Sequence, residues 1–451
     1  MVKSLAQAGT LVAGKTNMDE FGMGSHSLHS YNGPVENDNL PGPARSAGGS
    51  SGGSAMAVAN GQCRVALGTD TGGSIRLPAA FTGLVGFKPS YGQISRFGVV
   101  AYANSLDTVG IIGKSAEVVL QTFRAVRGPD DKDPTSMSTY TRLRFAEHNG
   151  QRYTDPGASR TDIKHRQPWT ELETKTLLPA DIEDDGEGTN WQRIIGVPKE
   201  YVIEELSDAV RQTWARSLSQ LEAQGHRVVP ISLPHTKAAL SAYYVLALAE
   251  ASSNLAKYDG VRYGVLRDGK EDMSEREETL FSQIRGAGFG AEVKRRILLG
   301  TYSLCSASRD NYFLKAQKVR RLVQGDFDSV FRLGNALHDR PPASDGGVDY
   351  ILCPTAPSPA PPLKHVQQSS PIDAYVNDVF TVPASLAGLP TISVPAPVGP
   401  ESSRLGHQGI GMQLIGQYGD DEGVLDFAQR YMEPSRAEMQ HYGRRNKKRF
   451  L

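Results

Sequence analysis

The chain has 451 residues, of which 49 are basic and 49 acidic, so its formal charge is zero. This length suits one large domain or two to three ordinary ones, and the balanced charge argues against a protein that grips nucleic acid with its whole surface. No apolar run approaches the ~20 residues that span a bilayer. The three cysteines, Cys63, Cys305 and Cys353, are far apart and odd in number, which disfavours a disulfide framework or a thiolate metal site.

The N-terminal part is rich in glycine, with many of the chain's 47 glycines before position 100. Residues 2–8 read as a short helix, and residues 10–13 are apolar and suit a buried strand. Glycine-rich loops then alternate with short helices and strands up to about residue 106. Apolar residues at helical spacing predict a helix over 115–127.

A polar stretch from about 129 to 191 interrupts this pattern with prolines, glycines and an acidic run at 181–187. Such a composition predicts a loosely packed surface insertion, which we place at 137–190. A smaller insertion is expected near 334–346.

The rest of the chain alternates between strand and helix patterns. Strands are expected at 194–198, 226–231, 348–353, 391–394 and 409–415, and helices at 207–224, 237–257, 292–327, 373–386 and 422–431. This alternation is typical of a mixed sheet covered by helices on both faces, so we predict one α/β domain over residues 1–451.

A phosphate-loop pattern, G-x-x-x-x-G-K-[ST], occurs at residues 9–16. A true phosphate loop lies between a buried strand and a following helix, whereas here a helix precedes the pattern and the loop positions are apolar. A nucleotide site that depends on Lys15 is therefore disfavoured.

A second pattern, G-x-S-x-G at residues 48–52, fits the nucleophile elbow of α/β-hydrolases. That elbow requires an acid and then a histidine later in the chain. None of the ten histidines has a convincing setting; His148 and His165 lie in the polar stretch and His365 follows a proline-rich loop. The pattern therefore does not predict a Ser-His-Asp hydrolase.

A third interpretation uses more of the sequence. Residues 47–54 read A-G-G-S-S-G-G-S and residues 69–76 read T-D-T-G-G-S-I-R, and between them a small-residue helix (55–60) and a strand (63–68) are expected. Glycine pairs before a serine let backbone N–H groups approach a substrate carbonyl closely. Convergent N–H groups of this kind form an oxyanion hole for acyl transfer. The two loops alone are also compatible with tight turns or phosphate cradles.

Together these segments, from about Lys3 to Ser136, resemble the amidase signature family, whose members use a Ser–cis-Ser–Lys triad. The resemblance implies that Ser74 is the nucleophile that forms the acyl ester and Ser50 the relay serine, held by a cis peptide after Gly49. It also implies that the oxyanion hole consists of backbone N–H groups of Thr71, Gly72, Gly73 and Ser74.

Further segments resemble one branch of that family, the glutamine-hydrolysing A subunits of glutamyl-tRNA(Gln) amidotransferases. The segments are residues 14–21, 91–98, 105–107, 197–201, 249–260, 288–301, 316–320 and 375–378. The branch implies that Tyr243, Arg296 and Asp378 bind glutamine, since an arginine fork suits a carboxylate. Tyr243 and Tyr244 could instead both be core residues, and Arg295 remains open as a one-residue alternative to Arg296.

The resemblance also implies an assembly. A B-type subunit would bind tRNA, ATP and Mg²⁺ and use the ammonia, a small third subunit would complete the complex, and this chain would need no cofactor of its own. The neutral charge fits that division of labour. We expect a mitochondrial matrix protein, with bacterial-type cytoplasm as the alternative.

One family feature is not found in the sequence. The triad lysine belongs to a V-K-D-N-type segment upstream of the glycine-rich loops, and no such segment occurs here. Lys3 and Lys15 are the nearby lysines. We therefore expect that the N-terminal part of an active protein is missing, or else that the chain is a catalytically inactive assembly subunit. A stand-alone amidase is the remaining alternative.

Overall fold

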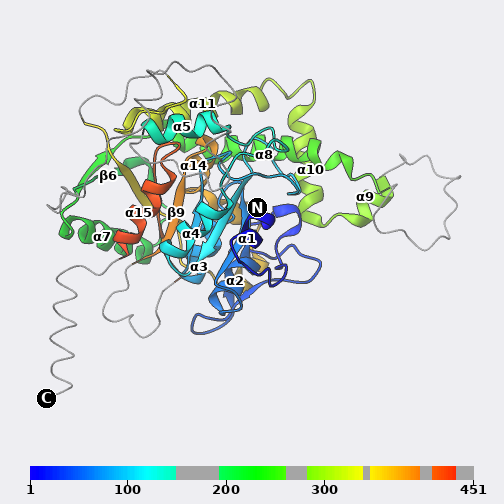
Figure 1. The fold of residues 1–451 in the computed structure, drawn as a ribbon. Coiled ribbons are helices and arrows are strands. Elements are labelled where there is room, and N and C mark those ends of the chain that lie inside the picture. The colour runs from blue at the N-terminus through cyan, green and yellow to red at the C-terminus, as the bar shows by residue number, and fades with distance from the viewer. Residues whose placement is uncertain (149–191, 261–281, 339–345, 397–408, 433–451) are drawn as a thin grey trace, which may run out of the picture.

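The computed structural model describes residues 1–148, 192–260, 282–338, 346–396 and 409–432 (Figure 1). The described strands are β1 (Glu36–Asn37), β2 (Arg45–Ser46), β3 (Val65–Asp70), β4 (Val85–Lys88), β5 (Thr108–Gly113), β6 (Ile194–Pro198), β7 (Arg227–Ile231), β8 (Tyr350–Pro354), β9 (Thr391–Pro395) and β10 (Gly411–Ile415). All but the short β1–β2 pair belong to one sheet of eight described strands.

Helices surround this sheet. They are α1 (Val2–Gln7), α2 (Gly52–Ala59), α3 (Arg76–Thr82), α4 (Ala116–Val126), α5 (Thr139–His148), α7 (Asp208–Ala223), α8 (Ala239–Asn254), α9 (Ser282–Gly288), α10 (Ala291–Leu304), α11 (Phe313–Val330), α12 (Leu363–Gln368), α13 (Pro371–Tyr375), α14 (Val382–Ala387) and α15 (Asp421–Tyr431), with short 3₁₀ turns that include η1 (Glu20–Gly22) and η5 (Val376–Asp378). Helices α9 and α10 lie to one side of the sheet (Figure 1).

The strand order is β3-β5-β4-β9-β10-β8-β6-β7. The strands from β3 to β8 pair antiparallel, whereas β8, β6 and β7 pair parallel, so the predicted mixed sheet is confirmed. Helices α2 and α3 pack on one face and α4 and α15 on the other.

Side-chain alternation along β5 explains why both faces are covered. Ile111 belongs to the large buried cluster that also contains Phe123 of α4, whereas Ile112 belongs to a second cluster with Val58 of α2. Successive residues of a strand point to opposite faces, so an all-apolar strand requires a helix on each side.

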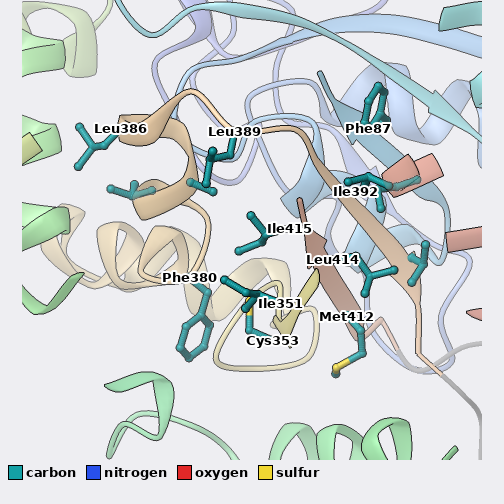
Figure 2. Close-up of a cluster of buried hydrophobic side chains, with 14 of the residues drawn as sticks. Phe87, Ile351, Cys353, Phe380, Leu386, Leu389, Ile392, Met412, Leu414 and Ile415 are labelled. Atoms are coloured by element: carbon teal, nitrogen blue, oxygen red, sulfur yellow. The ribbon is translucent and has the colours of Figure 1, made fainter. Parts of the chain in front are cut away.

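Part of the large cluster lies where β9, β10 and β8 meet α14 and Phe380, which follows η5 (Figure 2). Its labelled side chains include Ile392, Leu414 and Ile351 from the three strands, with Phe380 and Leu386 from the segment after η5. All five are fully buried. This packing fixes the position of η5, which carries Asp378.

Three predicted elements require correction. The pattern over 373–386 is not one helix but α13, the 3₁₀ turn η5 and α14, with residues 379–381 between η5 and α14. Residues 10–13 form no strand; they are exposed, Leu11 by 90%, because no described strand pairs with them. The pattern over 292–327 is two helices, α10 and α11, separated by the polar residues 305–312.

The first part of the predicted insertion is also packed rather than loose. Helix α5 buries Arg142 and Phe145, and Arg142 donates to the carbonyl oxygens of Gly92 and Gln93 at 3.1 and 3.0 Å. Residues 149–190 of that stretch lie outside the described residues. In the part of the chain that is described, no helix has the length and apolar character required to cross a membrane.

Candidate active site

The loop that carries Ser50 connects β2 to α2. Its Gly49–Ser50 peptide is cis, as predicted. The loop is closely surrounded, since a Cβ at Gly49 would lie 2.5 Å from both Asp19 Oδ2 and the backbone nitrogen of His26. The Ser50 side chain is fully buried, and its Oγ has no hydrogen-bond partner within the described residues. A buried hydroxyl without a partner is unusual in a folded protein and typical of groups that act in catalysis.

The loop that carries Ser74 connects β3 to α3, and it touches the first loop directly. The Ser51 N–H donates to the Ser74 carbonyl at 3.2 Å. Ser74 is partly exposed, whereas Ser50 is buried. The two predicted serines are therefore on adjoining loops, with Ser74 on the accessible side.

Backbone donors are available beside Ser74. The backbone N–H groups of Thr71, Gly72, Gly73 and Ser74 donate to no other residue in the described ranges, and the Thr71 hydroxyl donates a 2.7 Å bond to Asp107 Oδ1. The hydroxyl of Thr381 donates a 2.5 Å hydrogen bond to the Gly72 carbonyl and so contacts the Ser74 loop directly. This arrangement fits an oxyanion hole.

A buried ion pair anchors the same loop. Arg76 Nη2 lies 2.8 Å from Asp70 Oδ1, and both side chains are fully buried. Arg76 also donates to Gln413, Ser385 and the Thr381 carbonyl at 2.7–2.9 Å. Burial alone would raise the pKa of Asp70, but the charge and hydrogen bonds of Arg76 outweigh it and hold that pKa below its ordinary value.

The predicted carboxylate-binding residue, Arg296, is buried on α10. Its Nε donates to Glu292 Oε1 at 2.7 Å and its Nη1 to the Tyr102 hydroxyl at 2.8 Å. The rings of Tyr102, Tyr244 and Tyr375 surround the guanidinium at 5.6–5.9 Å. Arg295, the one-residue alternative, is 40% exposed and contacts the outer oxygen of Glu292.

Asp378 lies on η5 near Arg296. Its Oδ2 accepts hydrogen bonds from Tyr244 at 2.9 Å and from Ser25 at 3.0 Å. Burial raises the pKa of Asp378 to about 6, although the bonds from Tyr244 and Ser25 and the charge of Arg296 lower it in part. The carboxylate is thus poised for a cationic partner.

Tyr243 lies between the Ser74 loop and Tyr244, which donates to Asp378. A Cβ on Gly72 would lie 2.5 Å from the Tyr243 ring, and that ring packs edge-on against Tyr244 with centroids 5.0 Å apart. The structure therefore gathers Tyr243, Arg296 and Asp378 beside the Ser74 loop. A pocket lined by Ser25, His26, Glu292, Arg296 and Tyr375, among others, opens beside Arg296, whereas Ser74, Tyr243 and Asp378 are not part of its lining.

The competing patterns receive no support. Residues 9–16 are an exposed coil with no strand before them, which does not fit a phosphate loop.

The two lysines nearest in sequence, Lys3 and Lys15, are exposed, whereas Ser50 is buried. His26 lies against the Ser50 loop, but its ring nitrogens contact Ser46 and Asn377 rather than Ser50 or Ser74. No group of three His, Cys, Asp or Glu residues in the described segments is arranged to hold a metal ion.

Several site residues were not predicted from the sequence. Glu292, Tyr102, Ser25 and Thr381 each hold a predicted residue by a hydrogen bond. Glu292 precedes Arg296 by one helical turn, and that spacing was the one usable signal. The others come from segments distant in sequence.

Comparison with known proteins shows the family to which the chain belongs. The family model described as Amidase matches residues 1–157 and 163–425. The A subunit of the mitochondrial glutamyl-tRNA(Gln) amidotransferase of Coccidioides posadasii is 52% identical over 447 residues, which are 95% of this chain and 81% of the relative. The protein of the same name from Podospora anserina is 51% identical over 449 residues, with the same coverage.

A solved structure agrees with these relatives. The crystal structure of the A subunit of glutamyl-tRNA(Gln) amidotransferase from Thermotoga maritima has a TM-score of 0.66 and 32% identity, covering 96% of this chain and 75% of that one. The fold and the two serine loops define an amide-hydrolysing class of protein. The chain belongs to the amidase family.

Proposed function

We propose that this chain is the glutamine-hydrolysing subunit of a mitochondrial glutamyl-tRNA(Gln) amidotransferase. The names of the relatives support this assignment. The observation that carries it is the buried pair of opposite charges, Arg296 and Asp378, beside the Ser74 loop. A free amino acid presents both a carboxylate and an ammonium, and a general amidase has no need of two such partners.

Substrate binding follows from these charges. The carboxylate of glutamine pairs with the Arg296 guanidinium, which Glu292 and Tyr102 hold in orientation. Its ammonium pairs with Asp378. The side-chain amide then extends past Tyr243 toward Gly72 and Ser74, which places its carbonyl oxygen near the available N–H groups.

The chemistry is acyl transfer. Ser74 Oγ attacks the amide carbon and forms a C–O bond, and its proton passes by way of Ser50 to a base. The family uses a lysine as that base, and the V-K-D-N-type segment that carries it is not found in these 451 residues. The negative oxygen is stabilised by the N–H groups of residues 71–74. The proton then goes to the leaving nitrogen, the C–N bond breaks, ammonia departs, and water hydrolyses the γ-glutamyl ester on Ser74.

The ammonia serves a partner. We propose a B-type subunit that binds ATP, Mg²⁺ and tRNA and converts Glu-tRNA(Gln) to Gln-tRNA(Gln), with a small third subunit in the assembly. The zero formal charge of this chain fits a tRNA held mainly by that partner.

The test separates two ammonia sources. In the assembled complex, Ser74→Ala should abolish glutamine-dependent transamidation and leave transamidation with added ammonium salt intact. Ser253→Ala, on the exposed side of α8, is the control. If Ser74→Ala spares the glutamine-dependent reaction, the proposal fails. Turnover of simple amides without partners, unaffected by Asp378→Ala, would favour a stand-alone amidase instead.

A further inference from the structure

His26 is a buried side chain that the chemistry above does not use. Its side chain is 4% exposed, and it lies at the edge of the pocket that Arg296 and Tyr375 line. It is also parallel to the Phe81 ring, with an interplanar angle of 16° and centroids 6.4 Å apart. Neither contact alone gives the residue a role in the reaction.

The hydrogen bonds of His26 have a defined direction. Asn377 Nδ2 lies 3.3 Å from His26 Nε2 and also donates to the Ala374 carbonyl at 3.2 Å. An amide nitrogen only donates, so Nε2 accepts and the ring proton is on Nδ1. Nδ1 then donates to Ser46 Oγ at 2.8 Å. Burial lowers the pKa of His26 to about 4, which keeps the ring neutral, as this arrangement requires.

These two bonds connect the two halves of the site. Asn377 directly precedes Asp378 on η5. Ser46 Oγ also accepts the Gly48 N–H at 3.0 Å, and Gly48 directly precedes the cis Gly49–Ser50 peptide. One imidazole therefore bridges the turn that carries the ammonium-binding carboxylate and the loop that carries the relay serine.

The residues on either side of His26 reinforce the bridge. Ser25 Oγ donates to Asp378 Oδ2 at 3.0 Å, and Ser27 Oγ donates to the Gly48 carbonyl at 2.8 Å. Of these three consecutive residues, Ser25 bonds Asp378, Ser27 bonds the loop of Ser50, and His26 between them bonds both segments. The segment 25–27 therefore connects the turn of Asp378, where we propose that glutamine is held, to the loop of Ser50, through which the Ser74 proton passes.

We propose that His26 is a positioning residue that keeps the Ser50 loop in register with Asp378, and this inference rests on the proposed glutaminase function. Catalysis by oriented groups is sensitive to displacements of about 1 Å, which can cost on the order of 100-fold in rate. Loss of the bridge should therefore lower kcat with glutamine more than it changes KM.

The test uses the assembled complex and four variants. His26→Ala removes both bonds and should lower kcat with glutamine about tenfold or more. His26→Asn places an N–H near the Nδ1 position and should recover much of that loss. His26→Gln reaches Asn377 but lacks the donor to Ser46, so it should remain low. His365→Ala, an exposed histidine on α12, is the control and should behave as the unmodified complex.

A double-mutant cycle tests the connection to the Ser50 loop. Ser46→Ala removes the acceptor of the His26 bond and also that of the Gly48 N–H, so Ser46→Ala combined with His26→Ala should cost less than the sum of the two single losses. Full additivity of the two losses would contradict the bridge.

The outcomes distinguish this proposal from the function on which it rests. Reduced kcat with glutamine, unchanged rate with ammonium salt and rescue by asparagine support it. An unchanged kcat in His26→Ala, or an equal loss of both reactions with no rescue by asparagine, overturns it. If Ser74→Ala retains the glutamine-dependent reaction, the proposed function itself fails, whatever the His26 variants do.

Discussion

The N–H of Ser51 donates a 3.2 Å hydrogen bond to the carbonyl oxygen of Ser74. This bond joins the loop that starts α2 to the loop that starts α3, so buried Ser50 and partly exposed Ser74 lie on one connected backbone unit. Movement of either loop is expected to affect the other. The following predictions depend on that unit and on the charged pocket beside it.

Gly73 has no room for a side chain. Its φ is +152°, and a Cβ would lie 2.4 Å from Thr381 Oγ1. Gly73→Ala should displace Thr381, tilt the N–H groups and lower kcat with glutamine roughly 100-fold, in the range of losing one oxyanion donor. Steady-state kinetics of the complex checks this.

A matched alanine substitution provides the control. A Cβ on Gly325 in α11 would meet no atom within 4 Å. Gly325→Ala should leave kcat unchanged and raise the free energy of unfolding by about 0.5–1 kcal/mol, as is usual for a helical glycine. Equal kcat in both variants would contradict the assignment of the oxyanion hole.

Glutamine binding should require the planar guanidinium of Arg296 and not only its positive charge. Arg296→Lys keeps the charge but loses the geometry that Glu292 and Tyr102 fix, so the KM for glutamine should rise roughly tenfold or more. Arg295→Lys, at a 40% exposed position, should give a smaller rise. The reverse order of effects would show that the one-residue alternative is correct.

Asp378 should make glutamine binding dependent on pH. Its pKa is raised to about 6, so the carboxylate that pairs with the ammonium is present above pH 6 and is lost as the pH falls through that value. The KM for glutamine should therefore rise below pH 6, by up to about tenfold per pH unit. Asp378→Asn should have a high KM at every pH; retention of the pH dependence would point to another group.

The Asp70–Arg76 pair should dominate local stability. Asp70→Asn leaves a fully buried guanidinium without its counter-charge, which typically costs about 3–5 kcal/mol. Arg124→Ala, which breaks a pair with Glu422 at a 48% exposed side chain, should cost at most about 1 kcal/mol. Urea denaturation measures both, and a similar small cost for Asp70→Asn would refute the anchoring role.

The regular elements were predictable where periodicity and capping agreed. Strand β6 has the expected bounds, 194–198, and α7 begins after Ser207, whose hydroxyl accepts the Val210 N–H. Residues 10–13 have a strand composition but no neighbouring described strand, and composition cannot reveal pairing. The sequence does not predict the break between α10 and α11, because helical apolar spacing resumes directly after the short polar stretch 305–312.

The residues of the site likewise differ in how far the sequence alone could predict them. Ser50 and Ser74 lie in short glycine-rich motifs, so their sequence context was sufficient. Ser25 and Tyr102 contact Asp378 and Arg296 only because the fold brings distant segments together. His26 could not be assigned from sequence, because its role depends on Ser46 and Asn377 on other elements.

The central claim is that Ser74 forms a γ-glutamyl ester during glutamine hydrolysis. Its most direct test is to incubate the complex with glutamine, quench with acid, digest, and identify the modified peptide by mass spectrometry. The account predicts a γ-glutamyl group on Ser74 that is absent from Ser74→Ala. An adduct on another residue, or release of ammonia by Ser74→Ala at the unmodified rate, would contradict it.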